Sequence, residues 1–255
     1  MEALRAQLND LIIGLWWPFC RSMALFSAVP YLGDTPVPVV ARVLLSLALA
    51  VILLPVAAPA AHIEPASLQA VAVTAQQLLI GAGIGFAFQL TTAAVTVAGF
   101  VLSAQLGLSM ATMNDPINGV SSDAVSAMLT VLITLVFFSI DGHLVLTGVL
   151  GASFHAWPVG LAPSMDNLSV LAHCFTWIFS AALLLALPVI FSTLLVQMGF
   201  GLLNRINPML NLQSLGFAAI TLFGLFVLGY LLRFVPGHYV RLTDQVLDLL
   251  QRQFG

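Results

Sequence analysis

The residues whose chemistry could indicate an enzyme or a metal site are few and scattered. The chain has five histidines and two cysteines, and Cys20 and Cys174 lie far apart in apolar stretches without a C-x-x-C or His/Cys ligand pattern. No G-x-S-x-G, H-E-x-x-H, G-x-G-x-x-G or phosphate-loop motif occurs, and lysine is absent. The sequence therefore predicts no enzyme, no metal site and no cofactor.

The most unusual segment is residues 105–122, which is apolar yet interrupted by glycine, asparagine, aspartate and proline. Its second half is predicted to be a loop at membrane depth, which is tolerated only where protein or an aqueous cavity surrounds it. Such a loop favours a pore or gate, with Met110 and Met113 as flexible sealing side chains, although ordinary core packing of this pair stays open. The candidate plug residues are Gln105, Gly107, Met110, Met113, Asn114, Asp115 and Pro116.

Three glycines, Gly81, Gly83 and Gly85, lie inside an apolar run that resembles a helix. A G-x-G-x-G spacing within such a run fits close packing of a neighbouring helix better than a nucleotide site. We expect these residues to mediate helix packing.

The composition of the chain indicates which kind of secondary structure positions these residues. Hydrophobic residues make up 60% of the 255 residues and charged residues only 7%, whereas a soluble domain carries about 25% charged residues. This excludes a soluble globular domain. The net charge of -3 argues against binding to nucleic acid.

Long apolar runs predict an all-α, integral membrane-type fold, because only internally bonded helices or closed barrels cross lipid. The run at residues 65–114 is long enough for two crossings, or for one long bent helix followed by a loop. After Arg233, apolar residues recur at helical spacing and predict an amphipathic helix. The six apolar regions are residues 11–29, 43–61, 65–114, 124–140, 167–204 and 215–232, and the polar stretches 140–167 and 197–214 are predicted to be connections.

An ion-coupled transporter is the main alternative, since such proteins place ionisable groups near the middle of the membrane. Here every Asp and Glu lies at or beyond the end of an apolar run. The only charge within a run is Arg21, which is expected either to snorkel to the surface or to pair with a partner chain. The arginines in the connections give no clear orientation, which fits a subunit that is assembled among other proteins.

Residues 105–116 resemble the corresponding stretch of the flagellar biosynthesis protein FliR family, components of the bacterial type III export gate. Further stretches resemble that family in the same order along the chain. They are Trp17-Pro18 with Arg21, Gln76 to Gly81 with Gly85-Phe86 and Gln89, Gly142-His143-Leu144 with Phe154-His155, Leu187-Pro188-Val189-Ile190, and Gly201 to Arg205 with Pro208, Asn211 and Gly216-Phe217. The chain departs from the family pattern at Phe100, Met209, Gln213 and Ala218.

This resemblance implies a non-enzymatic subunit that assembles with FliP-type and FliQ-type subunits, and with an FlhB-type protein, into a hetero-oligomeric channel for unfolded flagellar proteins. It implies a location in the bacterial inner membrane, within the flagellar basal body. Residues 1–165 are expected to resemble FliP, and residues 166–255 to form a FliQ-like hairpin with an amphipathic tail, the whole being one export-gate domain. The residues expected at an inter-subunit or cytoplasmic-side connection are Asn204, Arg205, Pro208 and Asn211.

A channel for unfolded polypeptide must pass every type of side chain and still exclude ions at rest, which favours a deformable apolar constriction over a rigid polar filter. Residues 105–122 are the predicted plug. Two alternatives remain open from the sequence: the same gate subunit in a virulence secretion system, and a self-sufficient transporter of small solutes.

Overall fold

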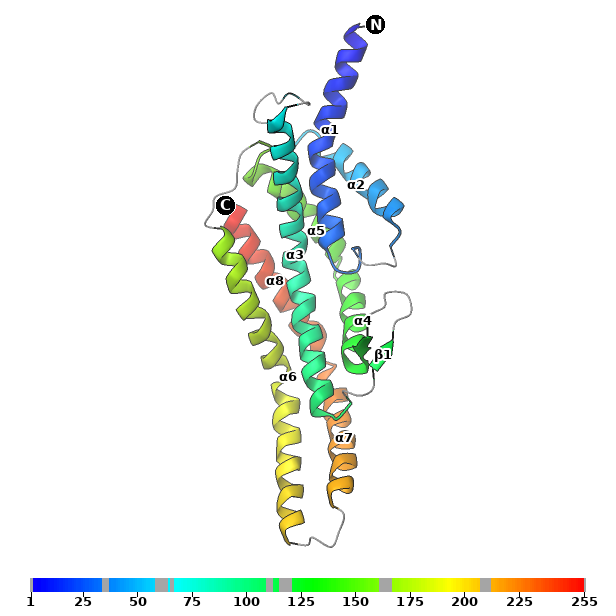
Figure 1. Ribbon diagram of the computed structural model, residues 1–255, viewed down its shortest axis with the longest axis vertical. Coiled ribbons are helices and arrows are strands. Elements are labelled where there is room, and N and C mark those ends of the chain that lie inside the picture. Colours follow the sequence, from blue (N-terminus) through cyan, green and yellow to red (C-terminus); the bar gives the residue numbers. More distant parts are fainter. Residues whose placement is uncertain are drawn as a thin grey trace. The chain divides into compact units, whose positions relative to one another are not determined.

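The computed structural model describes residues 2–33, 37–57, 64, 67–108, 112–114, 121–160, 167–206 and 212–254. Within these ranges the chain is built from helices and one small pair of strands (Figure 1). The elements are α1 (Glu2–Ala28), α2 (Val39–Leu53), α3 (Leu68–Gln105), β1 (Thr112–Asn114), β2 (Ser121–Asp123), α4 (Ala124–Ser139), α5 (Gly142–Ala156), α6 (Asn167–Ile206), α7 (Leu212–Leu231) and α8 (Val235–Phe254).

The predicted all-α fold of the membrane type is confirmed. Among the described residues, two helical stretches are long and apolar enough to cross a membrane, Leu68–Gln105 and Ser180–Ile206. The number of possible spans rises to four if each bent pair of neighbouring helices is counted as one span. The longest apolar region forms one 38-residue helix, α3, and not two separate helices, and its residues 112–114 form strand β1.

Both predicted connections are wrong in part, because residues 140–167 contain helix α5, whereas residues 197–214 include the end of α6 and the start of α7. Leu146, Leu150 and Phe154 of α5 recur every four residues and are all buried. This spacing puts the three side chains on one face of α5, so the helix buries an apolar stripe. The amphipathic tail is present as α8, in which Tyr239, Thr243 and Val246 are buried.

The helices form two compact units that interleave along the sequence. The first unit comprises Met1–Gln89, Phe137–Leu171 and Gln245–Gly255, and the second comprises Leu90–Val136 and Ala172–Asp244. The boundaries therefore fall inside α3, α4, α6 and α8.

In the first unit, α1 lies against α2 and against the first half of α3 (Figure 1). Pro18 lies inside α1, where a proline removes one backbone hydrogen bond of the helix. The helix continues through this point, and the Ser22 hydroxyl donates to the Pro18 carbonyl at 2.6 Å. The core of this unit includes the buried side chains Trp17, Leu25, Phe26, Ile80, Ile84 and Phe88.

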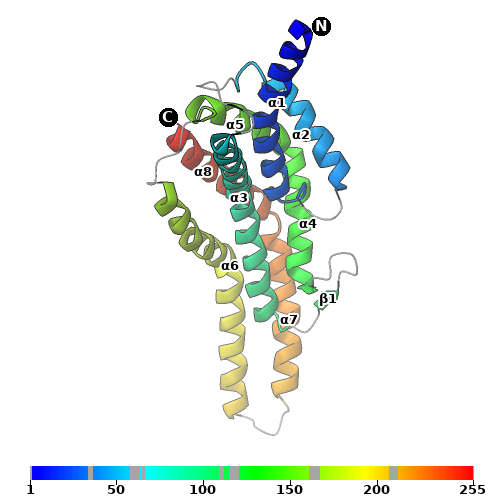
Figure 2. The same cartoon turned by 45° about the horizontal axis from the view of Figure 1, so that its top comes forward.

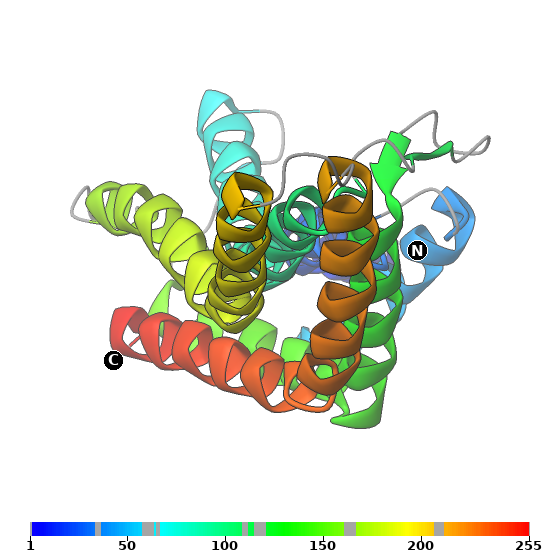
Figure 3. The ribbon, with the colours of Figure 1, turned by 90° about the horizontal axis from the view of Figure 1, so that it is seen from below.

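In the second unit, α6 and α7 lie side by side as an antiparallel pair (Figure 2). A Cβ atom at Gly216 of α7 would lie 3.6 Å from the Phe200 ring of α6, an ordinary packing distance. Beyond Leu231 the chain turns by 57° into α8, and Figure 3 shows this corner from below. Buried side chains of α3, of α4 and of Leu106, which follows α3, complete the core: Val95, Ala98, Leu102, Leu106, Leu129 and Ile133.

Candidate functional site

The predicted plug begins where α3 ends. Gln105 is the last residue of α3 and is half-buried, and Gly107 follows it with a positive φ of 71°. Met113 and Asn114 lie in strand β1, where the backbone alone is described. The remaining plug residues, Met110, Asp115 and Pro116, lie outside the described residues.

The segment is not loop throughout, because strands β1 and β2 pair in antiparallel register. Thr112 pairs with Asp123, Met113 with Ser122, and Asn114 with Ser121. An antiparallel pair brings its two chain ends to the same side. Strands β1 and β2 therefore form a two-stranded antiparallel ladder between α3 and α4, which we call the gate hairpin after its predicted role.

The first end of the gate hairpin is fixed by a helix cap. The Gly107 amide donates to the Ala104 carbonyl at 3.2 Å and the Leu108 amide donates to the Ser103 carbonyl at 2.9 Å. With glycine in the left-handed conformation, this pattern is a Schellman motif, which satisfies the last carbonyls of a helix and ends it sharply. Gly107 is therefore required as glycine by the backbone conformation at the end of α3.

This first end also rests against α7. The Thr221 hydroxyl donates to the Leu106 carbonyl at 2.9 Å, although 115 residues separate the two in sequence. A Cβ atom on Gly107 would lie 2.5 Å from the Phe217 ring, and a Cβ atom on Gly224 would meet the Leu106 side chain. Leu106 itself is fully buried. Leu106 and Gly107, just before the gate hairpin, therefore contact α7 at three positions.

The second end of the gate hairpin is fixed by Asp123, which caps α4. Its carboxylate accepts from the Ser126 amide at 2.9 Å and from the Ser126 hydroxyl at 2.7 Å. The same hydroxyl lies 3.0 Å from the Thr96 carbonyl of α3, and a Cβ atom on Gly99 would lie 2.7 Å from the Ser126 Cα. Asp123 is not among the predicted site residues, although an Asp directly before an apolar helical run is a strong N-cap signal.

The three packing glycines point in different directions from α3. A Cβ atom on Gly81 would meet the Arg21 carbonyl of α1, and one on Gly85 would lie 2.8 Å from the Leu25 carbonyl. Gly83 has nothing within 4 Å of its Cβ position. Positions i and i+4 share a helix face whereas i+2 does not, so the two outer glycines admit α1 and Gly83 faces open space.

This geometry gives opposite expectations for two alanine substitutions. Gly83→Ala should raise the free energy of unfolding by up to about 1 kcal/mol, because alanine favours helix over glycine and meets nothing there. Gly81→Ala should lower it by about 1–3 kcal/mol, because the added methyl group forces α1 away from α3. Thermal unfolding of both purified variants in detergent checks this. Equal shifts in the same direction would contradict the packing role of Gly81.

A second cluster surrounds Arg21 of α1, whose side chain is fully buried. Its Nε donates to the Gln77 Oε1 of α3 at 2.8 Å. One terminal nitrogen donates to the Ser153 hydroxyl of α5 at 3.0 Å, and the other donates to the Trp157 carbonyl at 2.8 Å. The guanidinium carbon lies 3.9 Å from the centre of the Phe154 ring, a cation–π distance. One arginine thus connects three helices of the first unit.

The expectation that Arg21 snorkels to the surface is wrong, because no part of its side chain is exposed. Its partners in the part of the chain that the structure describes are all neutral. A buried cation without a carboxylate is unusual, since removing the charge from water costs several kcal/mol. The hydrogen bonds and the aromatic ring offset that cost only if all of them form together, so the cluster favours one arrangement of the three helices.

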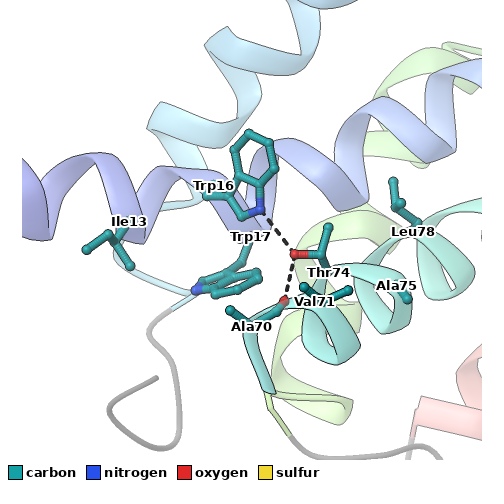
Figure 4. Close-up of a pocket in the computed structure, with 8 residues that line it drawn as sticks. All are labelled: Ile13, Trp16, Trp17, Ala70, Val71, Thr74, Ala75 and Leu78. Atoms are coloured by element: carbon teal, nitrogen blue, oxygen red, sulfur yellow. Dashed lines mark hydrogen bonds between the residues drawn. The ribbon is translucent and has the colours of Figure 1, made fainter. Parts of the chain in front are cut away.

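A pocket of about 580 Å³ opens between α1 and α3 (Figure 4). The Trp16 indole donates to the Thr74 hydroxyl at 3.2 Å, and that hydroxyl donates to the Ala70 carbonyl at 2.8 Å. The walls are otherwise apolar: Ile13, Trp17, Val71, Ala75 and Leu78. Within the described ranges, no three His, Cys, Asp or Glu side chains gather closely enough to hold a metal ion.

The predicted connection after α6 is described in part. Asn204 and Arg205 lie in the last turn of α6 and are exposed, where a cation complements the negative end of the helix dipole. Pro208 and Asn211 lie outside the described residues. Their inter-subunit role stays a prediction.

With its long apolar helices, the chain is a helical protein of the membrane type. The chain belongs to the family of bacterial export proteins, family 1, whose model matches residues 12–246.

Curated relatives agree with this family. The chain is 34% identical to the flagellar biosynthetic protein FliR of Pectobacterium carotovorum subsp. carotovorum, over 92% of this chain and 90% of that protein. It is 32% identical to the protein of the same name from Escherichia coli K12, over 92% and 90%. The Yop proteins translocation protein T of Yersinia pestis is 28% identical over 75% of each chain.

Proposed function

We propose that this chain is a structural and gating subunit of the flagellar type III protein export channel, needed for export of unfolded flagellar proteins and for assembly of the flagellum. The observation that carries this proposal is the family match over residues 12–246, together with flagellar relatives that align with more than nine-tenths of the chain. Its role is non-enzymatic: it forms part of the conduit and closes it.

The subunit works in a hetero-oligomer with FliP-type and FliQ-type subunits, with an FlhB-type protein beside it and unfolded substrates as transient partners. The assembly lies in the inner membrane within the flagellar basal body. The exposed apolar faces support this, because only 28% of the most apolar window in Ser180–Ile206 is buried within the chain itself. Exposed apolar area of this extent requires lipid or another protein to cover it.

The two parts of the chain have different roles. Residues 1–165 form the FliP-like part, and residues 166–255 form a FliQ-like hairpin, α6 and α7, with α8 as its amphipathic tail. The exposed end of α6 at Asn204 and Arg205, with Pro208 and Asn211, makes the connection to other subunits or to the cytoplasmic side.

The gate hairpin closes the export channel at rest. Both of its ends are anchored, by the cap of α3 and by the Asp123 cap of α4, whereas its predicted sealing side chains, Met110 and Met113, lie between these anchors. A segment fixed at both ends can fill a constriction and move aside without leaving the assembly. Flexible thioether side chains can close around irregular shapes and exclude water.

A virulence secretion system is the second candidate, and the similarity to the Yersinia translocation protein favours it. The flagellar relatives are more similar and cover more of the chain, so the flagellar system is the better assignment.

Copurification tests the proposed role. A tagged chain, co-expressed with the FliP-type and FliQ-type proteins of its own organism, is expected to bring down both partners in a stable detergent-solubilised complex. The lone chain in liposomes is expected to transport no small solute. Recovery of the chain without either partner, together with solute uptake by the lone chain, would assign it to the self-sufficient transporters instead.

A further inference from the structure

The pocket between α1 and α3, which we call the α1–α3 pocket, has walls without charge (Figure 4). The eight described residues that line it are all uncharged. Its volume of about 580 Å³ lies in the range of pockets that hold small organic molecules. A charged group that entered such surroundings would lose its hydration and gain no partner, so the pocket disfavours ions and charged side chains.

One polar group in these walls lacks a partner. Trp17 is only 2% exposed, and its indole nitrogen donates no hydrogen bond to any residue that the structure describes. The Trp16 indole, in contrast, donates to the Thr74 hydroxyl, which donates in turn to the Ala70 carbonyl. A buried donor without an acceptor is destabilising, because it gives up its bond to water and gains none. The pocket therefore favours an occupant that brings an acceptor to Trp17.

The surroundings of the α1–α3 pocket are suited to lipid. The pocket lies in the first turns of α3, one of the two described stretches that are long and apolar enough to cross a membrane. Val71 and Trp16 in its walls are 67% and 49% exposed, so the pocket continues into exposed apolar surface. Tryptophan is enriched where the hydrocarbon core of a bilayer meets the headgroups. The ester groups of phospholipids lie at the same depth.

We infer that the α1–α3 pocket binds an acyl chain of a membrane phospholipid, and that the ester carbonyl of this chain accepts a hydrogen bond from the Trp17 indole. An acyl ester matches the walls in both respects, because its chain is apolar and its ester group has acceptors but no donor. A peptide of another subunit fits less well, since its backbone amides also need acceptors. The Thr74 hydroxyl already accepts from Trp16 and donates to Ala70.

A bound acyl chain has a structural consequence for the first unit. The chain would contact α1 and α3 together, because both helices line the pocket. A ligand that binds only the folded state stabilises that state, so the lipid would help to hold α1 against α3. This inference does not depend on the proposed gating function.

Photo-crosslinking tests the occupant, in membrane vesicles from cells that contain the chain and all of its partners. The probe is an ester-linked phosphatidylcholine with a diazirine in one acyl chain, and mass spectrometry maps the labelled peptides. We expect label on residues 13–17 and 70–78. Ala75→Phe places a ring in the pocket and should lower this labelling by about five-fold or more. Ala72→Phe is the matched control, since Ala72 is exposed on the same helix outside the lining, and it should leave the labelling unchanged.

The hydrogen bond to Trp17 is tested with an ether-linked phosphatidylcholine of the same chain length, which lacks the carbonyl acceptors. Native mass spectrometry of the purified full chain measures the binding of each lipid. The wild type should bind the ester lipid about three- to ten-fold more tightly, as expected for one hydrogen bond. Trp17→Phe keeps an aromatic wall without the donor and should bind both lipids equally. Trp16→Phe should keep the preference, because the Trp16 donor is already bonded to Thr74.

Three results would overturn the inference. The first is equal labelling of Ala75→Phe and Ala72→Phe, which would mean that the lipid touches only the outer surface of the helix. The second is label on the lone chain but not on the chain among its partners, which would mean that a neighbouring subunit fills the pocket. The third is equal affinity of the wild type for the ester and ether lipids, and this comparison decides alone if Trp17→Phe fails to fold.

Discussion

Replacing Arg21 with alanine is expected to lower the free energy of unfolding by at least about 3 kcal/mol, because it removes three hydrogen bonds from a charged group and leaves a cavity. Three groups then lose a partner among the described residues: Gln77 Oε1, the Ser153 hydroxyl and the Trp157 carbonyl. A change of this size lowers the melting temperature by about 6 °C or more for a chain of this length. Thermal unfolding of the purified protein in detergent measures it.

Arg233→Ala is the matched control, since Arg233 is exposed and its loss should shift stability by no more than about 0.5 kcal/mol. Arg21→Met combined with Gln77→Leu removes the charge and its acceptor together. That double variant should recover part of the lost stability, because replacing a buried polar pair with apolar side chains is often neutral. If Arg21→Ala melted at the same temperature as Arg233→Ala, the three-helix role of Arg21 would be excluded.

The sequence predicts most of the helices because their signal is local. An apolar run that is long enough to span a bilayer can be recognised without information about the rest of the chain. Pro188 did not end α6, although proline inside a helix is a local signal for a break. Helix α5 is apolar but has only 15 residues, too few to span a bilayer, so a search for apolar runs of bilayer length does not reveal it.

The surroundings of Arg21 could not be predicted, for a different reason. Its partners Gln77, Ser153 and Trp157 lie 56, 132 and 136 residues away in sequence. No periodicity within one helix encodes contacts at such separations. The same holds for Thr221 and Leu106. Gly81 and Gly83 have similar sequence surroundings. Only the position of α1 shows that Gly81 is a packing contact and Gly83 is not.

The second large effect is expected from the gate hairpin itself. Burying one methionine side chain contributes about 1.5–3 kcal/mol, so replacing Met110 and Met113 together with alanine should shift the balance between closed and open by roughly a hundredfold or more. Ion leakage should rise accordingly, whereas protein export should persist, because the conduit is intact. The exposed helical methionines Met128 and Met198, replaced in the same way, serve as the matched control.

The most direct measurement is the ion conductance of the purified complete assembly in planar bilayers, with and without the shortened hairpin. We expect the wild-type assembly to be closed at rest, and the assembly in which two glycines replace residues 115–120 to conduct ions continuously. Two equally tight assemblies, or two equally leaky ones, would contradict the assignment of this hairpin as the gate.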